Sequence, residues 1–170
     1  MLEILRKRRS IRKFKKDRIE PARLDDLKEA VLRSPSSRGI KPWKFFFVQD
    51  AEVIKKLSIC KEHGSAYLKD APLAVVVCGD ETASDVWVED CSISALILHL
   101  TAESLGLGSC WIQIRNRRHS TDATSEEYVR KVLGIAAPIR VLAIIAIGIP
   151  DEAKAGHPFE SLEQGKVVFV

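Results

Sequence analysis

The chain has 170 residues, of which 46% are hydrophobic and 29% are charged. This length predicts one domain with a substantial core, and the composition excludes a disordered, collagen-like or disulfide-scaffold protein. The formal net charge of +4 is weak evidence for a polyanionic partner, although residues 6–18 are strongly basic.

We expect a cytoplasmic protein without a membrane anchor. No secretory leader is recognisable, and the longest apolar stretch, residues 92–100, is interrupted by Ser94 and His99. The cysteines form no Cys-x-x-Cys pair and have no histidine at metal-ligand spacing; they are Cys60, Cys78, Cys91 and Cys110. They are therefore predicted to be buried, reduced thiols, and no metal site is expected.

The first half of the chain alternates helix and strand signals. A short helix is expected over residues 2–9 with Leu2 and Leu5 turned inward, and a clearer one over 21–33, which opens on Pro21. Residues 43–49 read as an aromatic strand, and Asp50 is placed to cap a helix over 51–60. The β-branched run 73–78 predicts a buried strand.

The longest predicted helix covers residues 85–105 and is apolar on almost every face between Cys91 and Ala102. A chain of this size has little room to surround such a helix, which favours a subunit interface. Strands are expected over 109–114 and 139–149, on either side of a helix that ends at Gly134. Residues 151–170 form a polar tail that closes with a strand-like segment, 167–170. This order predicts a three-layer α+β or α/β domain spanning 1–170.

Two segments are candidates for ligand binding. The guanidinium groups and the hydroxyl of Arg8-Arg9-Ser10-Ile11-Arg12 suit one bound phosphate, and the alternative is a solvated charge run. The rigid, hydroxyl-rich loop 35–43 could lie along the edge of a flat ring, or simply connect a helix to a strand.

Other familiar sites are absent from the sequence. The glycines of Gly106-Leu107-Gly108 follow a helix and precede a strand, which is the wrong order for a dinucleotide fingerprint. No hydrolase, zinc-protease or phosphate-loop signature occurs. His99 on an apolar helix is more typical of a core or interface residue than of a base. With no convincing acid, base or nucleophile, an enzyme of this sequence would need a cofactor to carry the chemistry.

Four segments, taken in order, resemble the nitroreductase family of flavoproteins over nearly the whole chain. They are Arg8–Phe14, Ser34–Ser37 with Pro42-Trp43, Leu107–Ile112, and Ile147–Pro150. The resemblance implies a three-layer α-β-α fold with a mixed central sheet. It also implies an intertwined homodimer whose tail, 151–170, reaches the partner. FMN would be the cofactor and NADH or NADPH the electron donor. The acceptor would be a nitroaromatic, quinone or similar small molecule, reduced by a ping-pong mechanism.

The resemblance also implies roles for individual residues. Those matching the contacts to the FMN phosphate, ribityl chain and ring edge are Arg8, Arg9, Ser10 and Arg12. Those matching the loop that approaches the ring from the other subunit are Pro35, Ser36 and Ser37. Those matching the segment over the ring are Trp111, Ile112 and Gln113, with a backbone N–H near Gln113 facing flavin N5. No residue is expected to be catalytic in its own right.

The sequence also departs from the family pattern. Gly39 and Lys41 stand where many relatives have Asn and Gln. Lys154 matches only one member of a basic pair in the tail, because Gly156 and His157 stand where relatives have an Arg. Strand alternation through Trp111 would put Gln113, Arg115 and Arg117 on one face. We therefore hypothesise that Arg115, or Arg117 as second choice, replaces the missing tail charge. The alternatives are a solvated basic loop or one that selects NADPH.

Two other functions remain open at this point. One is a flavin-holding or flavin-sensing protein of the same fold with little turnover. The other is a nucleic-acid-binding module built on the basic N-terminus and residues 115–118, which no aromatic-interleaved platform supports. The visible spectrum of the purified protein would separate the two flavoprotein functions, which predict a yellow protein, from the nucleic-acid-binding module, which predicts a colourless one.

Overall fold

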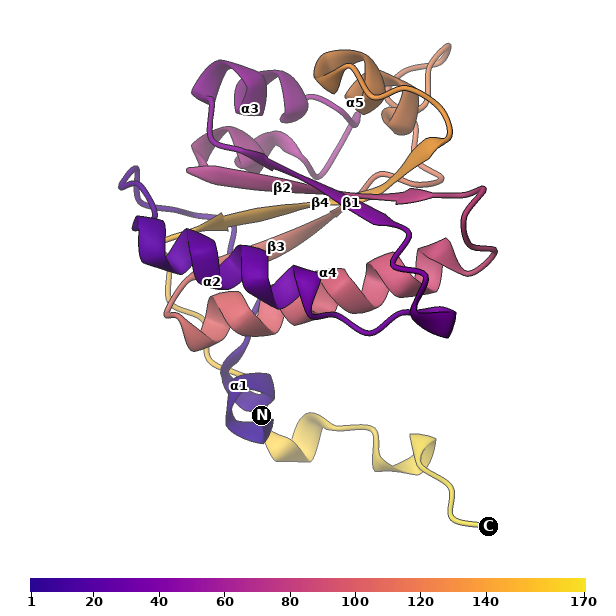
Figure 1. Ribbon diagram of the computed structural model, residues 1–170. Coiled ribbons are helices and arrows are strands. Elements are labelled where there is room, and N and C mark those ends of the chain that lie inside the picture. The colour runs from indigo at the N-terminus through magenta and orange to yellow at the C-terminus, as the bar shows by residue number, and fades with distance from the viewer.

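Four strands form one sheet at the centre of the computed structural model, which describes residues 1–170. They are β1 (Trp43–Val48), β2 (Leu73–Asp80), β3 (Gly108–Gln113) and β4 (Ile139–Gly148). Their order across the sheet is β1-β2-β4-β3, so the most hydrophobic strand of the sequence lies inside the sheet (Figure 1). All four predicted strands are confirmed. The continuous apolar runs of β2 and β4 are buried, as expected for the inner strands of a sheet that is covered on both faces.

The expected mixed sheet is wrong in its strand directions. Every neighbouring pair of strands is antiparallel. The helical crossover from β2 to β3 does make those two strands run the same way, as a crossover connection requires. However, β4 lies between them and runs opposite to both. The one parallel pairing is an isolated bridge between Ser10 and Ser109.

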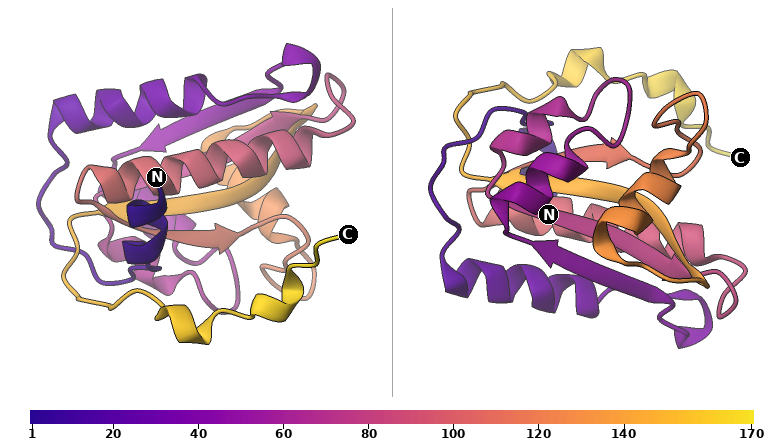
Figure 2. Two further views of the ribbon diagram at one scale, coloured as in Figure 1. Left: turned by 90° about the horizontal axis from the view of Figure 1, so that it is seen from below. Right: turned by 90° about the horizontal axis from the view of Figure 1, so that it is seen from above.

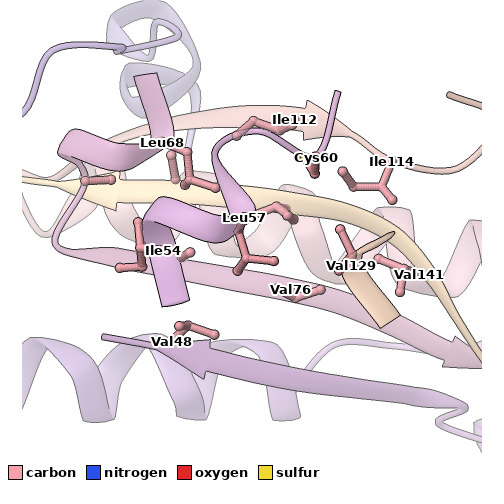
Figure 3. Close-up of a cluster of buried hydrophobic side chains, with 14 of the residues drawn as sticks. Val48, Ile54, Leu57, Cys60, Leu68, Val76, Ile112, Ile114, Val129 and Val141 are labelled. Atoms are coloured by element: carbon pink, nitrogen blue, oxygen red, sulfur yellow. The ribbon is translucent and has the colours of Figure 1, made fainter. Parts of the chain in front are cut away.

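Helices cover both faces of the sheet, which confirms the three-layer prediction (Figure 1). On one face lie α2 (Pro21–Leu32) and α4 (Trp87–Ser104). On the other lie α3 (Ala51–Leu57), the 3-10 helix η2 (Ala66–Asp70) and α5 (Ser125–Leu133). Because side chains alternate along β2, Val76 enters the core under α3 and α5, whereas Val75 enters the core under α4. Figure 3 shows the first of these cores, which contains Leu57 of α3, Val76 of β2 and Ile112 of β3.

Local capping sets several helix boundaries, and the predicted ones at Asp50 and Gly134 are confirmed. The Asp50 carboxylate accepts hydrogen bonds from the N–H groups of Glu52 and Val53, both at 2.9 Å. Helix α5 begins with a reciprocal cap between Thr124 and Glu127 and ends at Gly134, whose φ of 65° suits a residue without a side chain. These features need only neighbouring residues, which is why the sequence reveals them.

The two ends of the chain differ from expectation. Leu2 and Leu5 of α1 (Leu2–Lys7) are 59% and 49% exposed rather than turned inward. Helix α1 lies outside the three layers and packs mainly on α4, so much of its surface stays exposed (Figure 2). Residues 167–170 form no strand in the single chain. A strand needs a partner edge, and the tail extends away from the sheet (Figure 1).

Helix α4 is only partly covered. Its inner side is buried from Trp87 to Ala102, whereas Ile93 and Leu96 are 40% and 50% exposed. A single chain therefore leaves an apolar strip of this helix open, as its size suggested. None of the helices combines the length and the hydrophobicity that a membrane-spanning segment needs.

An ion pair between the buried Glu126 and the half-buried Arg140 joins α5 to the sheet. The carboxylate of Glu126 accepts from Nε and Nη2 of Arg140 at 2.6 and 2.9 Å, and from the N–H of Val141 at 3.0 Å. Arg140 Nη1 also donates to the more exposed Glu81 at 2.6 Å. Burial opposes the charge of Glu126, but the hydrogen bonds from Arg140 and Val141 outweigh it and hold the pKa of Glu126 below its usual range.

Glu126→Gln is expected to lower the free energy of unfolding by about 1.5–3 kcal/mol at pH 7, because it weakens charge-assisted bonds in a largely buried place. The matched control, Glu81→Gln, removes a partner of the same arginine that is half open to water, and should lower it by less than about 1 kcal/mol. Urea unfolding of both variants checks this. If both variants lose the same free energy of unfolding, the burial of Glu126 adds nothing to the strength of its bonds with Arg140.

Candidate functional site

The basic N-terminal segment lies along the outer edge of β3. Ser10 pairs with Ser109, and the N–H of Ile11 donates to the carbonyl of Ser109 at 3.0 Å. Ile11 is buried against Gly108, where an added Cβ would come within 2.8 Å of the Ile11 side chain. The absence of a side chain at 108 therefore lets this segment approach the strand. Two motifs about one hundred residues apart in the sequence meet here.

Three alternate residues of β3 face α4 and form a ledge together with a histidine. The ledge consists of Ser109, Trp111, Gln113 and His99. The indole N–H of Trp111 donates to the Gln113 side chain at 2.9 Å, which in turn donates to the carbonyl of Arg115 at 2.8 Å. Trp111 and Gln113 are each only half-buried, so the ledge is accessible from the side that β4 does not cover.

His99 supports the ledge from α4. Its Nδ1 lies 2.7 Å from the Ser109 hydroxyl, and its ring is stacked with that of Trp111, with centroids 6.2 Å apart. Burial, and then the positive charge of Arg8, lowers the pKa of His99 to about 4. His99 is therefore neutral at pH 7, as expected for a core histidine, and does not supply a proton there.

Backbone donors also point out of the ledge. In an antiparallel ladder, alternate residues turn their N–H groups toward and away from the neighbouring strand. The N–H of Ile114 donates to the carbonyl of Leu142 in β4, so the backbone N–H groups of Trp111 and Gln113 point the other way, toward the open edge of β3. Ile112, the third residue predicted over the ring, instead turns its side chain into the opposite core.

Basic side chains gather beside the ledge. Lys154 donates to the carbonyl of Ser10 at 2.9 Å and pairs with Glu152 at 2.9 Å. The guanidinium of Arg9 donates to the carbonyl of Ala155, and Arg8 lies close enough to His99 to shift its pKa. Arg12 lies farther along, with its guanidinium 5.7 Å from the centre of the Tyr67 ring. The structure thus brings Arg8, Arg9, Ser10 and Lys154 together.

Glu152 holds the tail against the N-terminal segment and was not found by sequence reasoning. Its carboxylate accepts from the N–H groups of Arg12 and Lys13 at 2.6 and 3.2 Å, and from Lys154. These bonds, the one from Arg12 first, lower the pKa of Glu152 to about 2. Nothing near Glu152 in the sequence signals this, because its partners at the other end of the chain become neighbours only on folding.

The structure also explains the glycine at 156. A side chain there would overlap the backbone carbonyl of Arg6. The tail passes so close to the end of α1 that only glycine fits. An arginine at this position would require a different path for the tail.

The loop with Pro35, Ser36 and Ser37 lies elsewhere in the single chain. The N–H of Ser37 donates to Asp90 at 2.8 Å, near the start of α4. His99 lies nine residues further along the same helix, about 13 Å at 1.5 Å per residue. One chain therefore does not bring this loop to the ledge.

The predicted alternation beyond Gln113 is wrong for Arg117. The N–H groups of Ile114 and Arg115 both donate to the carbonyl of Leu142, and Asn116 has a φ of 58°, so the chain turns away. Arg117 lines a wholly polar cavity of about 510 Å³ beside Glu126 and Arg140. This cavity lies at the start of α5, not at the ledge. The role of Arg115 stays a prediction.

Known proteins resemble the chain over most of its length. The model of the nitroreductase family matches residues 5–59 and 58–149. The chain belongs to the nitroreductase family. A structure described as an FMN-dependent nitroreductase from Clostridium difficile R20291 is 43% identical, with a TM-score of 0.98 over 99% of this chain and 98% of that one. A structure of an NADH dehydrogenase/NAD(P)H nitroreductase from Parabacteroides distasonis is 32% identical, with a TM-score of 0.86 over 96% and 94% of the two chains.

A curated relative agrees with these structures. A protein of Archaeoglobus fulgidus described as an NADH dehydrogenase/NAD(P)H nitroreductase is 33% identical over 157 residues, which cover 90% of this chain and 87% of that protein. The family membership predicted from four short motifs is thus confirmed. In this nitroreductase-family chain, the ledge and the basic cluster beside it form the candidate site.

Glu152→Gln is expected to destabilise the folded tail at pH 7 and to lose this effect in acid. A carboxyl whose pKa is lowered by folding stabilises the protein above its unfolded pKa, near 4.3, and stops doing so as the pH falls through its folded pKa, about 2. The difference in urea midpoint between parent and variant should therefore shrink between about pH 4.5 and pH 2. A difference that is constant down to pH 2 would contradict this assignment.

Proposed function

We propose that the protein is an FMN-dependent oxidoreductase that passes two electrons from NADH or NADPH to a nitroaromatic, quinone or related small acceptor. The observation that carries this proposal is the pairing of the Ser10 segment with the open edge of β3, because it puts phosphate-binding groups beside an accessible aromatic ledge. The Clostridium difficile structure, 43% identical and described as FMN-dependent, supports the same cofactor.

The residues present fit FMN. Arg8 and Arg9 supply charged donors for a phosphate, Ser10 adds a hydroxyl, and Lys154 has a remaining N–H beyond its bonds to Ser10 and Glu152. The outward N–H of Gln113 is placed to donate to the edge of a flat ring, where a donor stabilises negative charge. FMN, when bound, supplies the two-electron chemistry that no side chain of the ledge can perform.

The site is incomplete in one chain, which supports a homodimer. The loop 35–37 and the ledge lie at different points along α4, separated by about 13 Å. A two-fold axis near Leu96 would place the start of one α4 beside the second half of the other. The exposed apolar residues of α4, Ile93 and Leu96, lie around that point.

The tail gives a second reason for a partner subunit. Phe159, Leu162 and residues 167–170 are exposed in the single chain. Strand β1 has an unpaired edge, and beside it Leu32, Trp43 and Phe47 help to line an apolar groove of about 360 Å³. We propose that the tail, 151–170, reaches the partner and covers apolar surface there, since such surface is costly to leave in water.

Ile93→Asp and Leu96→Asp are expected to give monomers that also lose FMN, because a charge would be buried in the proposed interface. Ala22→Asp, on the exposed side of α2, is the matched control and should stay dimeric. Light scattering coupled to gel filtration and the flavin-to-protein absorbance ratio report both properties. If both α4 variants remain dimeric and yellow, α4 is not the interface.

A cytoplasmic location belongs to the same proposal. All four cysteines are buried and unpaired, which supports a reducing compartment.

Arg115 lies next to the ledge, because the Gln113 side chain donates a hydrogen bond to its carbonyl. It remains the residue that we predict to add positive charge to the phosphate site.

A second candidate is a flavin-binding protein of this fold with little turnover. It is favoured by the tail, where glycine replaces an expected arginine and Lys154 is already paired with Glu152. A weaker phosphate site would make flavin occupancy incomplete. Both candidates predict a yellow protein whose released chromophore is FMN, so only kinetics separates them.

Steady-state oxidation of NADPH or NADH in the presence of a quinone is expected to give parallel double-reciprocal lines. One face of a flat ring holds either the nicotinamide or the acceptor, so the two half-reactions alternate. Lines that intersect would indicate a ternary complex and contradict the ping-pong mechanism. A yellow protein without turnover for any nitroaromatic or quinone would favour the flavin-binding candidate instead.

A further inference from the structure

An aspartate of α4 is buried beneath the loop of residues 34–41. Asp90 is 2% exposed, and its Oδ1 accepts the hydrogen bond from the N–H of Ser37 at 2.8 Å. Its second oxygen, Oδ2, is buried without any hydrogen-bond partner. The hydroxyl of Ser34, at the start of the same loop, is also buried and unpartnered. Two of the three such side-chain atoms in the protein therefore lie at this loop.

The backbone of the loop is strained as well. Arg38 and Lys41 have φ values of 54° and 55°, in the left-handed region that residues with side chains rarely adopt. Within the loop, the N–H groups of Gly39 and Ile40 donate to the carbonyls of Ser36 and Ser37, both at 3.1 Å, and the N–H of Lys41 donates to the Ser36 hydroxyl at 2.9 Å. From outside the loop, Arg38 pairs with the exposed Asp85. Of the carboxylates that touch the loop, Asp90 is the buried one.

We propose that Asp90 is the positioning residue that holds Ser36 and Ser37 in the shape needed to contact FMN in the partner subunit. This inference rests on the proposed function, which places the loop at the flavin. A charged acceptor makes a stronger bond to a backbone N–H than a neutral one, and water cannot replace it in this buried place. Strained backbone and incompletely satisfied buried groups persist in folded proteins mainly at functional sites.

A different role for Asp90 would be to stabilise the start of its helix. Both Glu89 and Asp90 lie in the first turn of α4, where a negative charge is favourable. Glu89 is exposed, and no hydrogen bond or ion pair joins its side chain to the loop, whereas Asp90 accepts from Ser37. It is therefore the matched control, because changing it removes the same charge from the same turn and leaves the Ser37 bond intact.

The first measurement is trypsin cleavage after Arg38 in the flavin-free, full-length protein. Asp90→Ala should be cut about ten- to a hundredfold faster at this bond, because losing a charge-assisted hydrogen bond shifts the opening of the loop by that factor. Glu89→Ala should be cut at the parent rate. Cleavage after the exposed Lys166 in the tail is the internal reference and should not change in any variant.

The second measurement is the FMN dissociation constant, read from the quenching of flavin fluorescence. Asp90→Ala should weaken FMN about ten- to a hundredfold and Glu89→Ala should not. Asp90→Asn retains a neutral acceptor for Ser37, so its affinity should lie between those of the parent and Asp90→Ala. Its Tm should not fall below that of the parent, because it removes a buried charge. If Asp90→Ala does not fold, the cleavage after Arg38 and the FMN dissociation constant are both measured on Asp90→Asn.

The outcomes separate the two proposals. Equal cleavage of the Asp90 and Glu89 variants after Arg38 overturns the positioning role. So does a fall in Tm of Asp90→Asn with faster cleavage at every site, which would show a merely structural residue. Selective cleavage with unchanged FMN affinity also overturns it, because the loop then does not meet the cofactor. The proposed function fails in a different way, when the parent protein itself binds no FMN.

Discussion

The pairing of residues 10 and 11 with the outer edge of β3 is the contact on which the rest of the site depends. It requires a glycine at 108, because the buried side chain of Ile11 occupies the space that a Cβ would need. It puts Ser10 beside Ser109 of the ledge, with Arg8 near His99 and with Arg9 near Gly108, where the bridge is parallel. It also leaves the outward N–H groups of β3 free beyond residue 109, since the N-terminal segment pairs with the strand at one point only. A complete fifth strand along this edge would have used those donors.

Charge at the two ends of the chain strengthens this arrangement. Glu152 accepts two backbone N–H groups from the N-terminal segment and neutralises Lys154, so the tail and the basic motif hold each other in place. The same pairing reduces the positive charge that Lys154 offers to a phosphate. The structure therefore accounts for a departure from the family pattern at 154–156 in physical terms. The close passage past Arg6 excludes a side chain at 156, and the ion pair occupies the lysine.

Residues whose structural role depends on near neighbours were predicted well. The cap at Asp50, the buried strands around Val76 and Ile144, and the long apolar α4 follow from local chemistry and periodicity. Predictions that needed knowledge of distant partners failed. Strand β4 inserts between β2 and β3 and makes the sheet antiparallel, and a turn at Asn116 takes Arg117 away from the ledge. Leu2 and Leu5 have the pattern of a packed helix, but α1 packs mainly on α4 and both side chains stay exposed.

The sequence by itself determined the family, the elements and most of the candidate site residues, because four short motifs and the hydrophobic pattern are local properties. Only the tertiary structure decided how these residues are distributed in space. It joins Ser10 to Ser109, stacks His99 with Trp111 and buries Asp90 under Ser37. It also separates the loop at 35–37 from the ledge by part of the length of α4. Each of these relations joins residues far apart in the sequence, and the distance between them is fixed only when the helices pack against the sheet.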